Sequence, residues 1–347
     1  MASTTSNQQS TIPRPASPLP QSSAPFPRSL APFRPGDQFS LPVSGVAYYP
    51  DHPLTRQLNQ ACADNDLQRF QNLVAEWWRA ANPSPPRGPH GYDMATLEPC
   101  LYHAIRLDRS AFVAYLLDHG VLMSRLAASE AIEHRCSTAM WDAFLQNGGL
   151  DLNAAFHAEP PHLAYVLHDE ALVQWFLSHG ADPNAESEWG LSPFLRAVGH
   201  APLSIVKLLH RAGGSPAYAV AFVCQPSPSV ADAAGSASVP RDERLQVLRY
   251  LLDHGADPDV PKWTHNRKGV GSDFQWGSPL NAALSSRRAD LAEELLRRGA
   301  RTDIPTFNIA SRGETALELA ARRVPSLVPL IEECREKGRY DNAEGYH

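Results

Sequence analysis

Apolar side chains recur three and four positions apart in a series of short stretches that starts near residue 54 and runs to about residue 338. This spacing places them on one face of an α-helix, and Leu203, Val206 and Leu209 form one such stripe. Many of the stretches end at a glycine, the residue that most easily adopts the left-handed conformation closing a helix. The pattern therefore predicts an all-α protein built from pairs of short helices.

The closing glycines recur at a nearly regular interval. They are Gly120, Gly148, Gly180, Gly213, Gly255 and Gly299. Their successive spacings are 28, 32, 33, 42 and 44 residues, which indicates a repeat of about 33 residues with occasional insertions. Sixteen residues before a glycine stand the small residues Ala104, Ala164, Ala197 and Ala283, with Ile132 at the same offset in the third repeat. A small side chain at this place lets the neighbouring helix approach closely.

Each repeat also carries signals for the ends of its helices. Ser-Pro opens SPFLRA (192–197) and SPLNAA (278–283), where the hydroxyl caps free backbone N–H groups and Pro suits the first helical turn. The residue before the closing glycine is basic and suits the negative end of the helix. It is His119, His179, His254 or Arg298. Asp-Pro at 182–183 and 257–258 then turns the chain into an extended finger.

These motifs resemble the ankyrin repeat, whose signature is T-P-L-H-x-A followed by G-A-D-x-N. The resemblance covers about 54–338, and EPPHLA (159–164) alone keeps the family's His, at His162. It implies an ankyrin-repeat solenoid of about seven helix–turn–helix units with β-hairpin-like fingers, capped at 54–80 and at 315–338. The long insertions and the Pro/Ser-rich start are similar to those of filamentous-fungal ankyrin proteins.

Proline divides the chain into ordered and irregular parts. Eleven of its 31 prolines fall in residues 1–53, together with Ser, Thr and Gln and without periodic apolar positions, so we expect a disordered tail there. We expect a second disordered tail at 339–347. Within the solenoid domain of 54–338, flexible insertions are predicted near 225–241 and 259–277.

Charge and composition narrow the class of protein. A formal net charge of −6 gives no basic footprint for direct nucleic-acid binding. Five cysteines form no CxxC pair, which is typical of reduced thiols inside the cell, and no apolar run is long enough to span a membrane. We expect an intracellular protein, cytoplasmic or nuclear, that is monomeric.

Motifs for chemistry are missing from the sequence. There is no GxxxxGK[ST], GxSxG or GxGxxG, and the histidines before the closing glycines hold one repeated structural position. HAEPPH (157–162) lacks a third metal ligand at helical spacing. We therefore expect no catalytic residues, no metal and no cofactor. The alternative is an enzyme, or an accessory protein of one, with a site at the 259–277 loop that includes His265.

The resemblance implies that the concave face, made by first helices and fingers, binds another protein. The lengthened finger at 259–277 carries aromatic and basic side chains typical of interface anchors. They are Lys262, Trp263, Arg267, Lys268, Phe274 and Trp276. Two interpretations stay open: these rings contact a partner, or they fold back onto the adjacent repeat.

Further partner-binding residues are predicted outside this insertion. Trp189 stands at the tip of a finger of ordinary length. By family analogy, Arg106, His200, Arg322 and Arg323 face the groove from the first helices, and their polarity suggests a polar partner. The function expected from the whole sequence is a non-catalytic interaction scaffold that acts as a regulatory adaptor or transcriptional co-regulator.

Overall fold

The computed structural model describes residues 53–81, 97–155, 159–225, 240–262, 264, 277–306 and 313–336. Nearly all of the predicted N-terminal tail, the C-terminal tail and most of both predicted insertions lie outside the described residues. The described part is helical and contains no β-strand longer than a single bridge residue, so the all-α expectation is confirmed.

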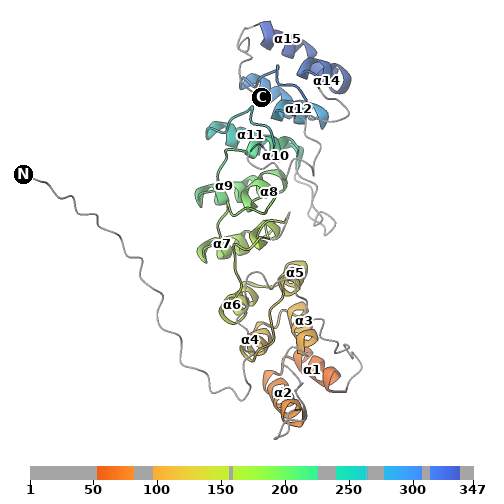
Figure 1. Ribbon diagram of the computed structural model, residues 1–347, viewed down its shortest axis with the longest axis vertical. Helices are drawn as coiled ribbons and strands as arrows, with labels where there is room; N and C mark the ends of the chain where they lie inside the picture. Colours follow the sequence, from red (N-terminus) through yellow and green to blue (C-terminus); the bar gives the residue numbers. More distant parts are fainter. Residues whose placement is uncertain are drawn as a thin grey trace, which may run out of the picture.

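The helices form eight successive pairs, here called units 1 to 8, stacked along one long axis (Figure 1). The pairs are α1 (Pro53–Ala63) with α2 (Leu67–Ala81), α3 (Glu98–Arg106) with α4 (Ser110–Asp118), α5 (Arg125–Glu133) with α6 (Thr138–Asn147), η3 (His162–Tyr165) with α7 (Glu170–Ser178), α8 (Pro193–His200) with α9 (Leu203–Arg211), α10 (Ala219–Cys224) with α11 (Arg241–Asp253), α12 (Pro279–Ser285) with α13 (Ala289–Arg297), and α14 (Ala316–Arg323) with α15 (Val328–Glu336). A short 3₁₀ turn, η6 (Pro325–Leu327), precedes α15. The eight units are one more than the approximate count from the sequence.

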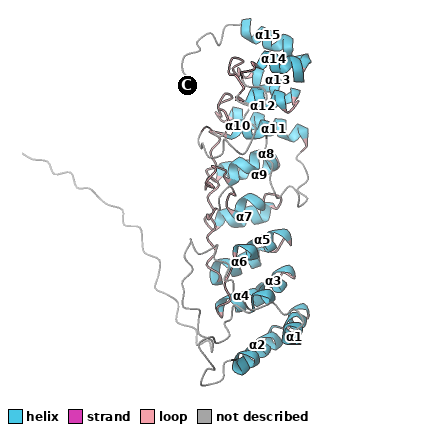
Figure 2. Ribbon diagram, turned by 45° about the vertical axis from the view of Figure 1, so that its right-hand side comes forward, coloured by secondary structure: helices cyan, strands magenta, loops and turns pink. Residues whose placement is uncertain are grey.

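Stacking buries one continuous core between neighbouring units. First helices pack on first helices, as α3 does on α5 and α10 on α12, and second helices pack on second helices, as α4 does on α6 (Figure 2). Units 3 and 4 meet through the fully buried Trp141, whose ring centroid lies 4.9 Å from that of Phe176. Because each unit covers its apolar faces mainly with its neighbours, stability spreads along the array instead of residing in one centre.

The helix ends follow the physical signals of the sequence. The Ser192 hydroxyl accepts a hydrogen bond from Leu195 N–H, and Thr315 forms a capping box with Glu318. Gly180 and Gly255 close their helices with φ of 94° and 83°. The expected caps and left-handed glycines are confirmed in these units.

Unit 3 departs from the predicted register. Gly148 stays right-handed with φ of −96°, and the left-handed residue is Gly149, with φ of 67°. A Cβ at Gly148 would lie 2.9 Å from the Phe144 carbonyl oxygen, so this glycine serves close packing and the next one makes the turn. Likewise Ala131, not Ile132, is the small first-helix residue that is almost fully buried.

The three histidines before closing glycines share one structure. In His119, His179 and His254, Nδ1 lies 2.7, 2.8 and 2.7 Å from the backbone carbonyl oxygen four residues earlier. Each imidazole ring also lies 4.1 Å, centroid to centroid, from the aromatic ring at that earlier position. The imidazoles thus satisfy carbonyl groups at the helix end, which confirms their structural role.

Asparagines at the start of two fingers link each unit to the next. Asn153 donates from Nδ2 to the Gly180 carbonyl (3.1 Å) and accepts from Asp182 N–H (2.7 Å). Asn184 repeats this arrangement one unit later: its Nδ2 donates to the Gly213 carbonyl and its Oδ1 accepts from Ser215 N–H, both at 2.8 Å. An amide can do both because it carries a donor and an acceptor.

A carboxylate replaces the asparagine between units 6 and 7. Asp259 accepts a hydrogen bond from Arg301 N–H at 2.7 Å. This bond corresponds to the ones that Asn153 accepts from Asp182 N–H and Asn184 from Ser215 N–H. Burial, helped by neighbouring Asp257 and Asp303, raises the pKa of Asp259 from 3.8 to about 6, against the opposing bond from Arg301. This junction therefore depends on protonation in a way the asparagine junctions do not.

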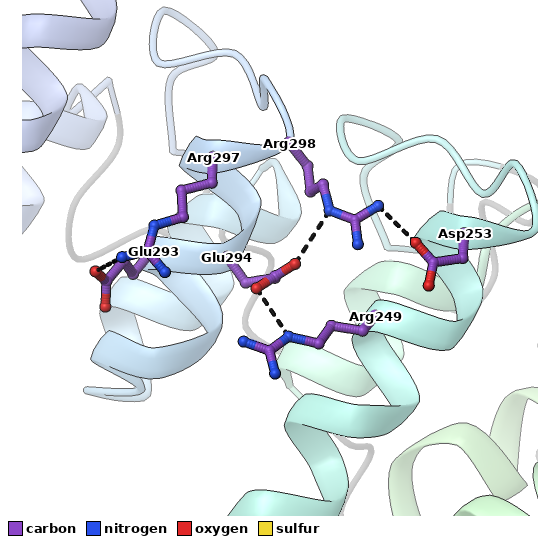
Figure 3. A network of polar contacts seen from close by, with 6 residues as sticks. All are labelled: Arg249, Asp253, Glu293, Glu294, Arg297 and Arg298. Carbon is purple, nitrogen blue, oxygen red and sulfur yellow. Dashed lines mark hydrogen bonds and ion pairs between the residues drawn. The ribbon is translucent and has the colours of Figure 1, made fainter.

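An ionic network also joins units 6 and 7. Glu294 on α13 is nearly buried and accepts from Arg249 Nε of α11 at 2.9 Å and from Arg298 Nε at 3.1 Å. Arg298 reaches back to Asp253 at 2.7 Å (Figure 3). One carboxylate thus binds two guanidinium groups that come from successive units.

Candidate partner-binding surface

The first helices differ sharply in what they expose. In units 5 to 7 they are covered along almost their whole length: α8 is buried from Pro193 to Gly199, α10 throughout and α12 from Pro279 to Leu284. In units 2 and 3, only one face of α3 and α5 is buried, and charged side chains of the other face reach solvent. Solvent-accessible first-helix side chains are therefore concentrated toward the two ends of the array, in units 1 to 3 and in unit 8.

Arg106 is one of the predicted groove residues that the structure exposes. Its guanidinium binds Glu130 of the next first helix in bidentate fashion, with N···O distances of 2.9 and 3.1 Å. The Arg106 side chain is 51% exposed, whereas that of Glu130 is 15% exposed. The hydrogen bonds from Arg106 hold the pKa of the Glu130 carboxyl below its ordinary value.

Arg322 has a similar partner at the other end of the array. It binds Glu314 through two nitrogens at 3.2 and 2.6 Å, with the arginine side chain 45% exposed. Both predicted cations are thus fixed by carboxylates of this chain while remaining accessible. A partner would meet a pre-oriented guanidinium at each site.

The other predicted first-helix and fingertip residues are less accessible. His200, at the end of α8, and Arg323 are half-buried, and the Nε of Arg323 is buried without a hydrogen-bond partner. Trp189 is also half-buried, inside the turn in which Ser187 N–H bonds the Leu191 carbonyl at 3.0 Å.

Lys262 lies inside the protein, which differs from its predicted place on the partner surface. The residue is 5% exposed, its Nζ donates to the Gln225 carbonyl at 2.9 Å, and it lies 5.0 Å from the centroid of the Phe222 ring. The interaction ties the start of the second insertion to the end of α10. Lys262 therefore anchors this insertion, because its ammonium is satisfied by the protein.

The remaining predicted contacts lie outside the described residues. They are Trp263, Arg267, Lys268, Phe274 and Trp276, together with His265 of the alternative enzymatic site.

Among the described residues, the titratable side chains that could serve in metal binding or catalysis are separated from one another or buried at several positions. No group of three potential metal-ligating side chains occurs among them. Burial raises the pKa of the Cys100 and Cys224 thiols to about 12, so they stay protonated and unreactive at neutral pH. Burial lowers the pKa of His162 to about 4, which keeps this family-type histidine neutral. Within the same residues, no helix is long and apolar enough to cross a membrane.

Four exposed or partly exposed residues of units 2 and 3 were missed from the sequence. They are Tyr102, Leu122, Leu126 and Glu130. The Tyr102 hydroxyl lies 2.6 Å from Glu98 Oε1 and 2.9 Å from Ser124 Oγ in the next unit. A signal was present for two of them, since Leu126 and Glu130 are four residues apart in one helix.

Comparisons with known proteins place the central units in a family. A family model described as ankyrin repeats (many copies) matches residues 162–210, which include η3, α7 and most of α9. A crystal structure of the ankyrin repeat domain of Bcl-3, described as a unique member of the IkappaB protein family, is 19% identical. The alignment covers 80% of this chain and 97% of that one, with a TM-score of 0.39. No curated protein matches the chain.

Proposed function

We propose that this chain, whose residues 162–210 match an ankyrin-repeat family model, is a non-catalytic ankyrin-repeat scaffold that binds another protein with its first helices and fingers. Ankyrin repeats are protein–protein interaction modules. The finer role that we propose is that of a regulatory adaptor or transcriptional co-regulator, acting inside the cell as a monomer without direct contact to nucleic acid. Its net charge of −6 fits a protein partner better than a nucleic acid.

The main support is the fixed polar surface on the open first helices. Arg106 on Glu130 and Arg322 on Glu314 each hold a guanidinium in one orientation while leaving about half of the side chain exposed. Groups that are already ordered lose less conformational entropy when a partner binds. Such a surface suits recognition of a protein partner.

The proposed surface extends to the second insertion. Trp263, Arg267, Lys268, Phe274 and Trp276 combine the aromatic and basic character of interface anchors. The buried Lys262 fixes the point where this segment leaves unit 6. Trp189, His200 and Arg323 complete the proposed contact set.

Proximity labelling by the full chain in its native cells tests the proposal. We would compare the native chain with the double variant Arg106→Glu, Arg322→Glu and with the control Arg297→Glu, whose residue lies on a second helix and is 61% exposed. We expect a defined set of labelled proteins to disappear with the double variant and to remain with the control. An identical set for all three chains would contradict binding through the first helices.

A further inference from the structure

Resting on the proposed function, we propose that units 2 and 3 bind a peptide segment of the partner protein that presents an apolar side chain beside a carboxylate. The segment would lie on a surface made by α3, α5 and the finger between units 2 and 3. We call it the Leu126 surface, and its members are Tyr102, Arg106, Leu122, Leu126 and Glu130.

Contacts between the two units hold these residues together. The Tyr102 hydroxyl reaches Ser124 Oγ at 2.9 Å, and Arg106 reaches Glu130 at 2.9 and 3.1 Å. Leu126 stands one helical turn before Glu130 on the same side of α5, and Glu130 is the residue that binds the Arg106 guanidinium. The apolar and cationic parts are therefore neighbours on one rigid surface.

The leucines of this surface are not used by the core. Leu126 is 54% exposed and Leu122 is 43% exposed. With Leu107, they are three of the four large apolar side chains classed as exposed in the described part of the chain. The core side of α5 is already filled by its buried alanines. Covering the leucines with an apolar side chain of a partner would remove this surface from water, which favours association.

Charge selects an acid as the second recognition element. At the Arg106–Glu130 pair the arginine side chain is 51% exposed and the glutamate side chain only 15%, so the pair presents mainly its positive partner to solvent. A carboxylate arriving from solvent can reach the exposed part, whereas a lysine or arginine of a partner would meet a like charge.

A second ion pair gives the bound segment a direction. Arg125 pairs with Glu159 on the side of unit 4, and there the carboxylate is the more exposed partner, at 48% against 23%. The two pairs thus present opposite charges, one where α5 meets unit 2 and the other where α5 meets unit 4. The acidic end of the segment is expected over unit 2 and any basic end over unit 4.

Selection of random twelve-residue peptides displayed on phage, with the full chain as bait, tests this inference. We expect enriched sequences to share an apolar residue and an acidic residue within one helical turn. Synthetic copies are then measured by fluorescence anisotropy against the native chain and four variants. Leu126→Ser and Arg106→Gln should each weaken binding at least tenfold, and Arg106→Gln should also flatten the dependence on salt. The matched controls Tyr218→Ser and Arg297→Gln alter exposed residues far along the chain and should leave affinity unchanged.

Two results would overturn the inference. One is enrichment of peptides without acidic residues, or of none at all. The other is a peptide that binds the Leu126→Ser variant as tightly as the native chain. If partners in cells still depend on Arg106 and Arg322 under either result, the proposed function stands and only the assigned peptide chemistry fails. Amide hydrogen exchange of each variant, expected to match the native chain outside the substituted helix and its ends, separates lost binding from lost folding.

Discussion

Units 2 and 3 and units 5 to 7 are built from the same repeat, yet their first helices do different work. In units 2 and 3 these helices are nine residues long and keep one face in water, where Arg106 and Leu126 lie. In units 5 to 7 they have eight, six and seven residues and are buried almost throughout. The repeat thus fixes where helices begin and end, while the neighbouring parts of the chain decide whether a first helix serves packing or recognition.

The largest expected effect tests whether the central first helices are core. Phe194→Ala on α8 removes a ring that is 0% exposed, and we expect a loss of about 3–5 kcal/mol of unfolding free energy. Urea unfolding followed by circular dichroism measures it. The matched change Leu126→Ala on α5 should cost less than about 0.5 kcal/mol, because its side chain is half in solvent. Equal losses of unfolding free energy at Phe194 and Leu126 would contradict the difference between the buried first helices of units 5 to 7 and the open ones of units 2 and 3.

The next effect concerns how the central units are tied together. Glu294→Ala leaves Arg249 and Arg298 without their shared carboxylate, and we expect a loss of about 2 kcal/mol. Amide hydrogen exchange should show faster opening of α11 and α13. Glu293→Ala is the control, since its pair with Arg297 is exposed and contributes less than about 0.5 kcal/mol. Unchanged exchange in the Glu294 variant would show that apolar packing alone holds this junction.

A smaller effect is the dependence of stability on pH through the Asp259 carboxyl. Because the pKa of Asp259 is about 6 in the folded protein and 3.8 ordinarily, proton binding stabilises the fold fully below about pH 4, and this contribution is lost as the pH rises through 6. Because Asp259 is partly exposed, we expect this contribution to the unfolding free energy to be about 1 kcal/mol. Asp259→Asn, which restores the residue type of the other junctions, should raise the thermal midpoint at pH 7 and remove the pH dependence.

The reverse substitution is the control for Asp259. Asn184→Asp places a carboxylate where an amide now donates to the Gly213 carbonyl, so it should lower the thermal midpoint at pH 7 more than at pH 4. The charged groups that act on Asp259 are one cation, Arg301, and two acids, Asp257 and Asp303. Thermal scans at two salt concentrations separate the effect of these charges on the pKa of Asp259 from the effect of burial. A native midpoint that does not change between pH 4 and pH 7 would contradict the raised pKa.

The smallest expected effect on the unfolding free energy is in units 2 and 3, whose first helices keep one face in water. Arg106→Gln breaks an ion pair whose arginine is half exposed, so the unfolding free energy should fall by less than about 0.5 kcal/mol. Chemical denaturation at low and high salt measures it. A larger loss would mean that this pair holds units 2 and 3 together and is not chiefly a recognition surface.

The sequence predicted the parts of the fold that depend on local signals. Ser192 and Ser278 cap helices and Gly180 closes one because each acts on residues within one turn. Unit 3 was placed incorrectly because two glycines stand side by side, and only packing against Phe144 assigns Gly148 to the helix and Gly149 to the turn.

The site was less predictable because it depends on distant residues. Lys262 is buried against a carbonyl 37 residues earlier, which no local pattern indicates. Arg106 was predicted as accessible, but its carboxylate partner lies 24 residues later on the next first helix. Exposure of Leu126 likewise depends on how α5 lies beside its neighbours, so its spacing from Glu130 alone could not distinguish a core stripe from an accessible one.

The most direct test of the central claim is amide hydrogen exchange of the full chain, alone and with a protein identified by proximity labelling. We predict that the partner slows exchange in α3, in the finger at 121–124 and in α5, and leaves the second helices α9 and α11 unchanged. Slower exchange confined to second helices, with none in α3 and α5, would contradict the assignment of the open first helices as the binding surface.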